Sequence, residues 1–169
     1  MKRRTRLHLI HPADAGPVAL RALRILLADP DPPFSDAVLL LAGSADERRA
    51  ARLGVHTTDR IIPPAGAISR CAPPLRRYLR ERGRPDVIHA WSPDAARLAA
   101  DVAPAAPRVL SPMRPPADGL TPIRRPVAPR TGPIADVSLG PPEINAAWRL
   151  AAPTPLAFRH IPIPPPLPA

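Results

Sequence analysis

The stretch Pro85-Asp86-Val87-Ile88-His89-Ala90-Trp91-Ser92-Pro93-Asp94 joins a short buried strand to a helix. Its last three residues have the chemistry of a helix start: a serine N-cap, a proline at the first helical position and an acid in the first turn. The residues after them share one helix face at helical spacing, namely Ala95, Leu98, Ala99 and Val102. A strand followed at once by a helix is the repeating unit of an α/β protein.

The same unit occurs three times before this stretch. The run 37–42 is continuously apolar, which is typical of a parallel strand covered on both faces. The other predicted elements are strands at 7–10, 59–62 and 108–111, and helices at 16–28, at 44–53 and from Pro73 to Gly83. Four units and a fifth strand require right-handed crossovers. The sequence therefore predicts a doubly wound, mostly parallel, Rossmann-like α/β sheet with helices on both faces.

The chain of 169 residues fits one domain, and we assign residues 1–161 to it. The segment 112–133 is crowded with prolines and arginines and is predicted to be a long loop. After it we expect a sixth strand at 134–138, a helix at 143–150 and an edge strand at 156–161. Residues 162–169 form a proline-rich tail or a truncated linker with extended backbone.

The composition is strongly basic, with a formal net charge of +10 and Lys2 as the only lysine among 24 basic residues. Such a charge invites a nucleic-acid interpretation. The arginines are nevertheless scattered over most of the predicted helices, which favours a solvated surface, and we expect no nucleic-acid partner.

Cys71 is the single cysteine, so no intramolecular disulfide can form and we expect a reducing, cytoplasmic location. The apolar stretch near the N-terminus is too short for a signal peptide, and no run reaches the length of a membrane span. We therefore expect at most peripheral membrane contact.

The motifs of common cofactors are missing from the first predicted strand-to-helix turn. Gly16 is the only glycine there, so the dinucleotide fingerprint is absent, and no phosphate-binding loop ending in Gly-Lys-Ser/Thr occurs. We expect no cofactor, and the histidines show no metal-ligand spacing. Gly16 could let a ligand approach the helix start, or it could simply form a tight turn.

The remaining candidates follow from one rule, that ligands of an open parallel sheet bind beyond the carboxyl ends of its strands. His89 lies near such an end and could act as a base or orient a sugar hydroxyl, or it could be a core histidine bonded to backbone. Ser92 lacks the frame of a hydrolase nucleophile and is better explained as a helix cap. Asp94 and His11 are likewise better explained structurally than catalytically.

Read in order, the landmarks between residues 6 and 162 resemble the amino-terminal half of the family 4 glycosyltransferases of GT-B architecture. The most specific piece is Arg84-Pro85-Asp86-Val87-Ile88-His89-Ala90-Trp91-Ser92, which is similar to that family's Pro-Asp-hydrophobic-hydrophobic-His-x-His-Ser strand. Ala135-Asp136-Val137-Ser138 and His160-Ile161-Pro162 support it. Trp91 stands where the family has its second histidine, so only His89 matches by position.

The resemblance implies the acceptor-side half of a sugar transferase. We expect Gly16, His89 and Ser92 to contact a sugar or glycolipid acceptor, and we assign no catalytic residue. The half that holds the nucleotide sugar is absent from this chain, so a separate carboxy-terminal half is the implied partner and the chain alone should be inactive. The alternatives are a non-catalytic Rossmann-like interaction module that uses the loop 112–133, and a nucleic-acid-binding protein.

Overall fold

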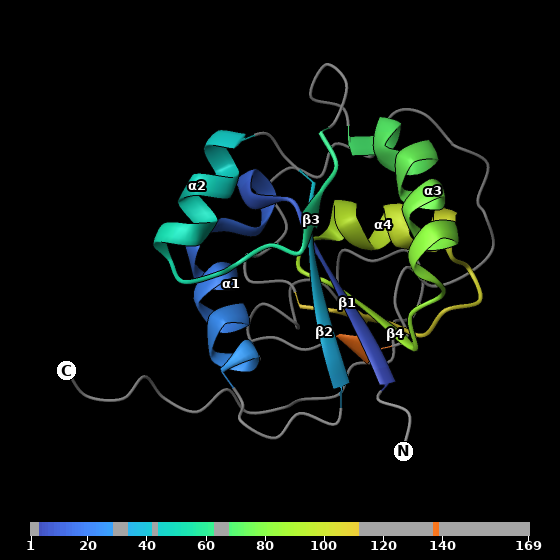
Figure 1. Cartoon of the computed structure of the whole chain (residues 1–169), viewed down its shortest axis with the longest axis horizontal. Helices are drawn as coiled ribbons and strands as arrows, with labels where there is room; N and C mark the ends of the chain where they lie inside the picture. Colours follow the sequence, from blue (N-terminus) through green and yellow to red (C-terminus); the bar gives the residue numbers. More distant parts are fainter. Residues whose placement is uncertain (1–3, 29–33, 42–43, 63–67, 112–136, 139–169) are drawn as a thin grey trace, which may run out of the picture.

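The central feature of the fold is a parallel sheet, seen in a computed structural model that describes residues 4–28, 34–41, 44–62, 68–111 and 137–138 (Figure 1). Its strands have the order β3-β2-β1-β4-β5-β6, and every neighbouring pair is parallel. The strands are β1 (Arg4–Ile10), β2 (Phe34–Leu40), β3 (Asp59–Arg60), β4 (Val87–Ala90), β5 (Arg108–Leu110) and β6 (Val137–Ser138). The predicted doubly wound, Rossmann-like class is confirmed.

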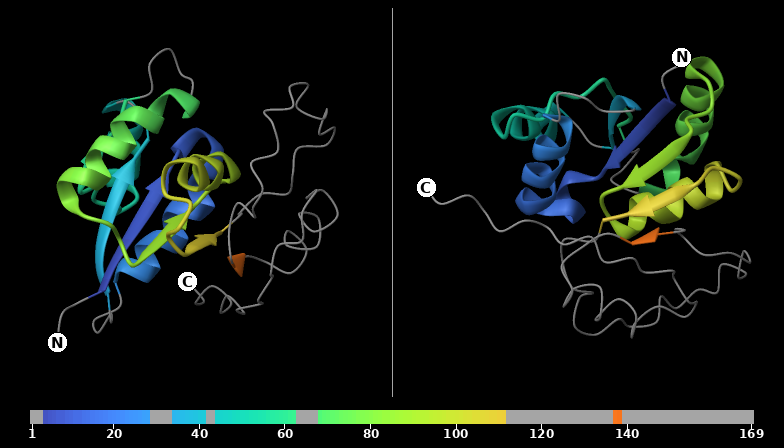
Figure 2. Two further views of the ribbon diagram at one scale, coloured as in Figure 1. Left: turned by 90° about the vertical axis from the view of Figure 1, so that its right-hand side faces the viewer. Right: turned by 90° about the horizontal axis from the view of Figure 1, so that it is seen from below.

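Helices cover both faces of this sheet (Figures 1 and 2). One face carries α1 (Pro12–Leu27) and α2 (Ser44–Arg52), and the other carries the short 3-10 helix η2 (Ile68–Cys71), α3 (Ala72–Arg82) and α4 (Pro93–Val102). Among the described residues, no helix is both long and apolar enough to cross a membrane.

Each face has its own core, because successive side chains of a strand point to opposite faces. In β1, Leu7 and Leu9 pack under α3 and α4, whereas Ile10 packs under α1 and α2. In β2, Leu39 and Leu40 divide in the same way. The cores are almost entirely aliphatic, which agrees with the low aromatic content of 3%.

The elements predicted within the described residues are present, with shifted ends. Strand β1 starts three residues earlier than expected, at Arg4, because its first residues pair with β2 and the Thr5 amide donates to the Asp86 carboxylate at 2.7 Å. Strand β3 is shorter than predicted. The helix predicted at 44–53 spans Ser44–Arg52. Its Glu47 carboxylate accepts hydrogen bonds from Thr57 and Arg60, which lie beyond the helix.

Several predictions fall outside the described residues. These are the loop 112–133, the first part of the strand expected at 134–138, the helix at 143–150, the edge strand at 156–161 and the tail 162–169.

Candidate functional site

The strand order defines where a ligand is expected to bind. The chain leaves β1 toward β2 on one side and returns to β4 on the other, so the order reverses between β1 and β4. In open α/β sheets, the crevice outside the carboxyl ends of two such strands is the usual binding place. Two segments border it here, the one from His11 to Gly16 after β1 and the one from Trp91 to Ser92 after β4.

Gly16 has a backbone that only glycine adopts readily. Its φ is 74° and its ψ is 176°, and it breaks the regular helical geometry inside α1. This region of backbone space is essentially closed to residues with a Cβ. Gly16 therefore separates a short first helical stretch, 12–15, from the longer rest of α1. This kink agrees with the tight-turn interpretation, and contact of Gly16 with a ligand stays a prediction.

His11 occupies the N-cap position of α1 without capping it. Its side chain makes no capping hydrogen bond, and its buried Nδ1 has no hydrogen-bond partner among the described residues. It lies between the end of β1 and Gly16, beside the crevice.

Ser92 is the N-cap of α4. Its Oγ accepts a hydrogen bond from the Ala95 amide at 3.2 Å, and the residue is fully buried. Pro93 follows at the first helical position and Asp94 lies in the first turn. The hydroxyl thus satisfies one of the free amides at the helix start.

His89 lies on the sheet face that α1 and α2 cover, and it is only 6% exposed. Its Nε2 is 2.7 Å from the Ser111 Oγ, and its ring stacks on Trp91 with centroids 4.4 Å apart. Burial, aided by the charges of His8 and Arg6, lowers the pKa of His89 well below the ordinary value. The imidazole is therefore neutral near pH 7 and can accept or donate one hydrogen bond at each nitrogen.

His8, for which no functional role was predicted, lies beside His89 on the adjacent strand. The two residues are register partners of β1 and β4, and their ring centroids are 5.2 Å apart. His8 is fully buried. Burial lowers its pKa to about 4, although the hydrogen bond and charge of Asp36 act in the opposite direction.

The bonding of His8 fixes its tautomer. The Trp91 Nε1, which can only donate, lies 3.2 Å from the His8 Nδ1, so that nitrogen accepts. The proton is then on Nε2, which donates to the Asp36 Oδ1 at 3.0 Å. His8 thereby links the Asp36 carboxylate to the Trp91 indole.

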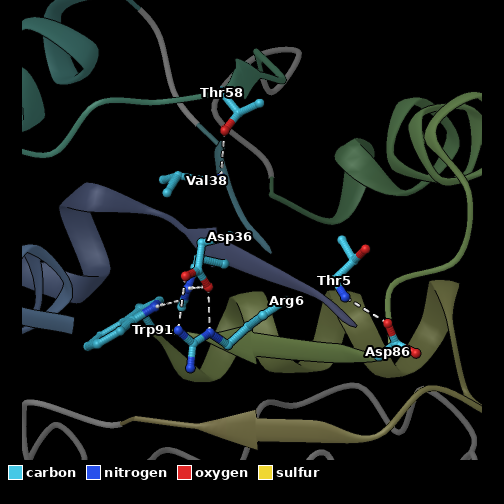
Figure 3. A network of polar contacts seen from close by, with 8 residues as sticks. Thr5, Arg6, Asp36, Val38, Thr58, Asp86 and Trp91 are labelled. Carbon is cyan, nitrogen blue, oxygen red and sulfur yellow. Dashed lines mark hydrogen bonds and ion pairs between the residues drawn. The ribbon is translucent and has the colours of Figure 1, made fainter. Parts of the chain in front are cut away.

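Asp36 is held from a second side by Arg6, its register partner on β1. The two form a bidentate pair, with Nε 2.5 Å from Oδ1 and Nη2 3.0 Å from Oδ2 (Figure 3). Burial acts to raise the pKa of Asp36, but the hydrogen bonds from Arg6 and His8 outweigh it and the pKa is lowered. Asp36 is therefore a carboxylate at neutral pH.

These contacts form one connected set, which we call the β1–β4 polar cluster; it comprises Arg6, His8, Asp36, His89, Trp91 and Ser111. It supplies two neutral imidazoles held at fixed orientation near the carboxyl ends of β1 and β4. In the described part of the chain, no group of three or more His, Cys, Asp or Glu side chains could hold a metal ion.

The structure brings together only part of the predicted site. Ser92 lies just after β4 and Gly16 lies on the connection that leaves the neighbouring β1, so both belong to the two segments at the strand reversal. His89 lies within β4 itself, buried and bonded to Ser111. His8 and Asp36 were not predicted as site residues, because neither belongs to a recognisable sequence motif. A signal was available: His8 lies two residues before the end of β1, His89 lies one residue before the end of β4, and these two strands are neighbours in this fold.

Comparisons with known proteins connect the fold, though not the sequence, to sugar-nucleotide enzymes. No protein-family model matches the chain, and no curated protein matches it. A solved structure of UDP-N-acetylglucosamine 2-epimerase superposes with a TM-score of 0.63 at 12% identity, over 94% of this chain and 46% of the epimerase.

The UDP-GlcNAc 2-epimerase from Neisseria meningitidis, solved with UDP-GlcNAc bound, superposes with a TM-score of 0.59 at 14% identity, over 88% of this chain and 44% of its own. The chain thus spans about half the length of the solved structures that it matches. At this level of identity the match establishes the fold: this chain has the fold of one half of these epimerases.

Proposed function

We propose that this chain is one half of a two-domain enzyme that acts on a nucleotide sugar, and that it is the half on the acceptor side. The support is the pairing of two observations. The strand reversal between β1 and β4 is bordered by Gly16 and Ser92, and the solved proteins with the same fold process UDP-linked N-acetylglucosamine.

Glycosyl transfer is the reaction that we favour, because the stretch from Arg84 to Ser92 resembles a strand of the family 4 glycosyltransferases. Epimerisation of a nucleotide sugar is the second candidate, and the two superposed epimerases favour it. The resembled glycosyltransferases hold donor and acceptor between two Rossmann-like halves, and this chain covers less than half of each superposed epimerase, so both candidates call for a second half.

In this proposal Gly16, Ser92 and His89 each have a distinct role. Gly16 lets a sugar ring come close to the backbone at the start of the longer part of α1, since no Cβ intervenes. Ser92 fixes the start of α4 and so positions the amides that face the crevice. His89 lies within β4, where its neutral ring is oriented by Ser111 and Trp91.

The partner in this proposal is a separate carboxy-terminal half that holds the nucleotide sugar, and the acceptor is a sugar or glycolipid. A cytoplasmic location follows from the same proposal. The free and buried Cys71 suits a reducing compartment.

The test is a titration of the full chain with two probes, in which NMR of the backbone amides detects binding. Methyl N-acetylglucosaminide at millimolar concentration should shift the amides of Gly16 and Ser92 and leave those of His56 and Gly83 unchanged. UDP-GlcNAc should bind no more tightly than the methyl glycoside, because the donor-holding half is missing. Tight, specific binding of UDP-GlcNAc to this chain alone, or sugar-induced shifts away from the crevice, would contradict the proposal.

A matched pair of variants separates the crevice from general effects. Gly16→Ala should abolish the shifts caused by the methyl glycoside, whereas Gly83→Ala, at a glycine of similar backbone conformation far along the chain, should keep them. Equal loss in both variants would mean that the glycoside does not depend on the crevice.

A further inference from the structure

A cavity lies at the amino ends of the strands, whereas the proposed sugar site lies at their carboxyl ends. It has a volume of about 370 Å³, is open to solvent, and is lined by the second half of α3, the end of α4 and the residues around Arg84 and 103–106. These segments lead into β4 and β5, so the cavity is at the amino ends of those strands. Gly16 and Ser92 follow strands and lie at the carboxyl ends.

Three arginines border this cavity in a single row. Arg76 and Arg80 lie four residues apart on α3, Arg84 lies two residues beyond the end of this helix, and all three are exposed cavity-lining residues. Like charges at this spacing on a helix repel and are destabilising. None of the ion pairs found among the described residues involves any of the three.

The neighbouring face of the same helix has the opposite arrangement. Arg77 pairs with Glu81 four residues later, with 2.8 Å between Nε and Oε1. Helix α3 therefore compensates an arginine where it faces away from the cavity, whereas none of the three arginines of the row is ion-paired within the described part of the chain. An anionic ligand would supply the missing charge.

The wall of the cavity is fixed by further arginine contacts. The buried Arg108 donates through Nη1 to the carbonyls of Ala103, Pro104 and Ala106, at 3.1, 2.8 and 3.1 Å. Arg84 donates to the Ala105 carbonyl. The carbonyls of this loop are thus occupied, which leaves a wall that presents few acceptors to a ligand.

Donors remain on the row itself, because a guanidinium carries five N–H groups. Arg76 makes one long contact of 3.4 Å with the Asp101 carbonyl, and Arg84 makes the one just described. Between these cationic groups the lining is apolar, formed by Leu79, Val102 and the side chains of the loop. The cavity therefore joins a strongly cationic rim to an apolar floor.

We propose that this cavity binds a small phosphorylated molecule with an apolar or planar body. The phosphate lies between Arg76, Arg80 and Arg84, since planar guanidinium forks match phosphate oxygens in pairs. The body rests on Leu79 and Val102. The volume of about 370 Å³ falls in the usual range for small-molecule sites, roughly 300–1,000 Å³. This site is independent of the proposed sugar site.

Phenyl phosphate is the probe for the first experiment, with inorganic phosphate and phenol as its two halves. The full chain, labelled at arginine side chains and at methyl groups, is titrated with each and followed by NMR. Phenyl phosphate should saturate, shift the Leu79 and Val102 methyl signals, and bind more tightly than either half. Absence of saturation, or equal affinity for inorganic phosphate, would overturn the proposal.

Two triple variants of equal net charge separate the row from diffuse attraction. R76Q/R80Q/R84Q should weaken phenyl phosphate binding by about tenfold or more, as expected for the loss of charge-assisted bonds. R77Q/R82Q/R97Q removes three exposed arginines outside the cavity and should leave the affinity unchanged. Equal weakening in both would show that overall charge attracts the ligand.

Vesicles of phosphatidylglycerol and phosphatidylcholine test a membrane as the source of phosphate. Sedimentation that depends on the row, in a chain that does not saturate with phenyl phosphate, would replace the small-molecule site by a lipid-binding surface. The comparison of the three probes on the unaltered chain needs no variant, so the proposal stays testable even where a triple variant fails to fold.

Discussion

The Nε2 of His89 lies 2.7 Å from the Oγ of Ser111, and this buried hydrogen bond joins β4 to the residue that follows β5. Ser111→Ala should lower the free energy of unfolding by about 1–3 kcal/mol, because a buried ring nitrogen loses its partner. Urea denaturation measures the change. Ser35→Ala, at an exposed serine of β2, is the control and should have little effect.

The two buried histidines should make the protein sensitive to mild acid. The pKa of His8 is lowered to about 4 in the folded chain, from an ordinary value of 6.5. Between these values the unfolded chain binds a proton that the folded chain does not, so stability is full above pH 6.5 and falls as the pH drops toward 4. Below that pH the His8 contribution is lost entirely, which amounts to about 3 kcal/mol.

Urea midpoints measured across this pH range, on the wild type and on His8→Gln, test the assignment. The variant should show a shallower fall, because His89 still titrates and its pKa is also lowered. His56→Gln, at an exposed histidine, should keep the wild-type profile. An unchanged profile for His8→Gln would mean that protonation of His8 is not linked to unfolding.

Asp36 is the residue on which the β1–β4 polar cluster depends most. Asp36→Asn removes the charge that Arg6 and His8 share, so about 2 kcal/mol of stability should be lost, as for hydrogen bonds to charged groups. Unfolding in urea gives the change, and tryptophan fluorescence should report a looser Trp91. Glu81→Gln, which breaks only an exposed pair, should be neutral. Similar losses in both variants would contradict this account.

Most of the fold was predictable because its signals are local. The apolar run 37–42 and the cap Ser92-Pro93-Asp94 each specify one element within a few residues, and repetition of the strand-plus-helix unit restricts the topology. The element ends were less predictable, since β1 extends to Arg4 only through its pairing with β2.

The polar cluster was not predictable in the same way, because its contacts cross the sheet. His8 and His89 are 81 residues apart in the sequence, and they meet through the pairing of β1 with β4. His8 and Asp36 meet through a second pairing, that of β1 with β2. Only the strand order combined with the strand registers brings the three residues to one face. Neither the order nor the registers can be inferred from a single stretch of sequence.

Gly16 and Gly83 provide a comparison of backbone strain at two places. Their φ values are 74° and 90° and their ψ values 176° and 166°, a region essentially closed to other residues. Alanine at either position should cost about 1–3 kcal/mol in the free energy of unfolding. At Gly83 a new Cβ would meet no atom within 4 Å, so the loss there measures the backbone alone.

The two losses should be similar if Gly16 is required only for its backbone, and urea denaturation of both variants provides the values. A much larger loss at Gly16 would mean that the added Cβ also collides with the packing around the start of α1. A negligible loss at Gly16, with a clear loss at Gly83, would show that the turn after β1 adopts another conformation. That result would also weaken the proposed sugar site, which needs the backbone at Gly16 to be open.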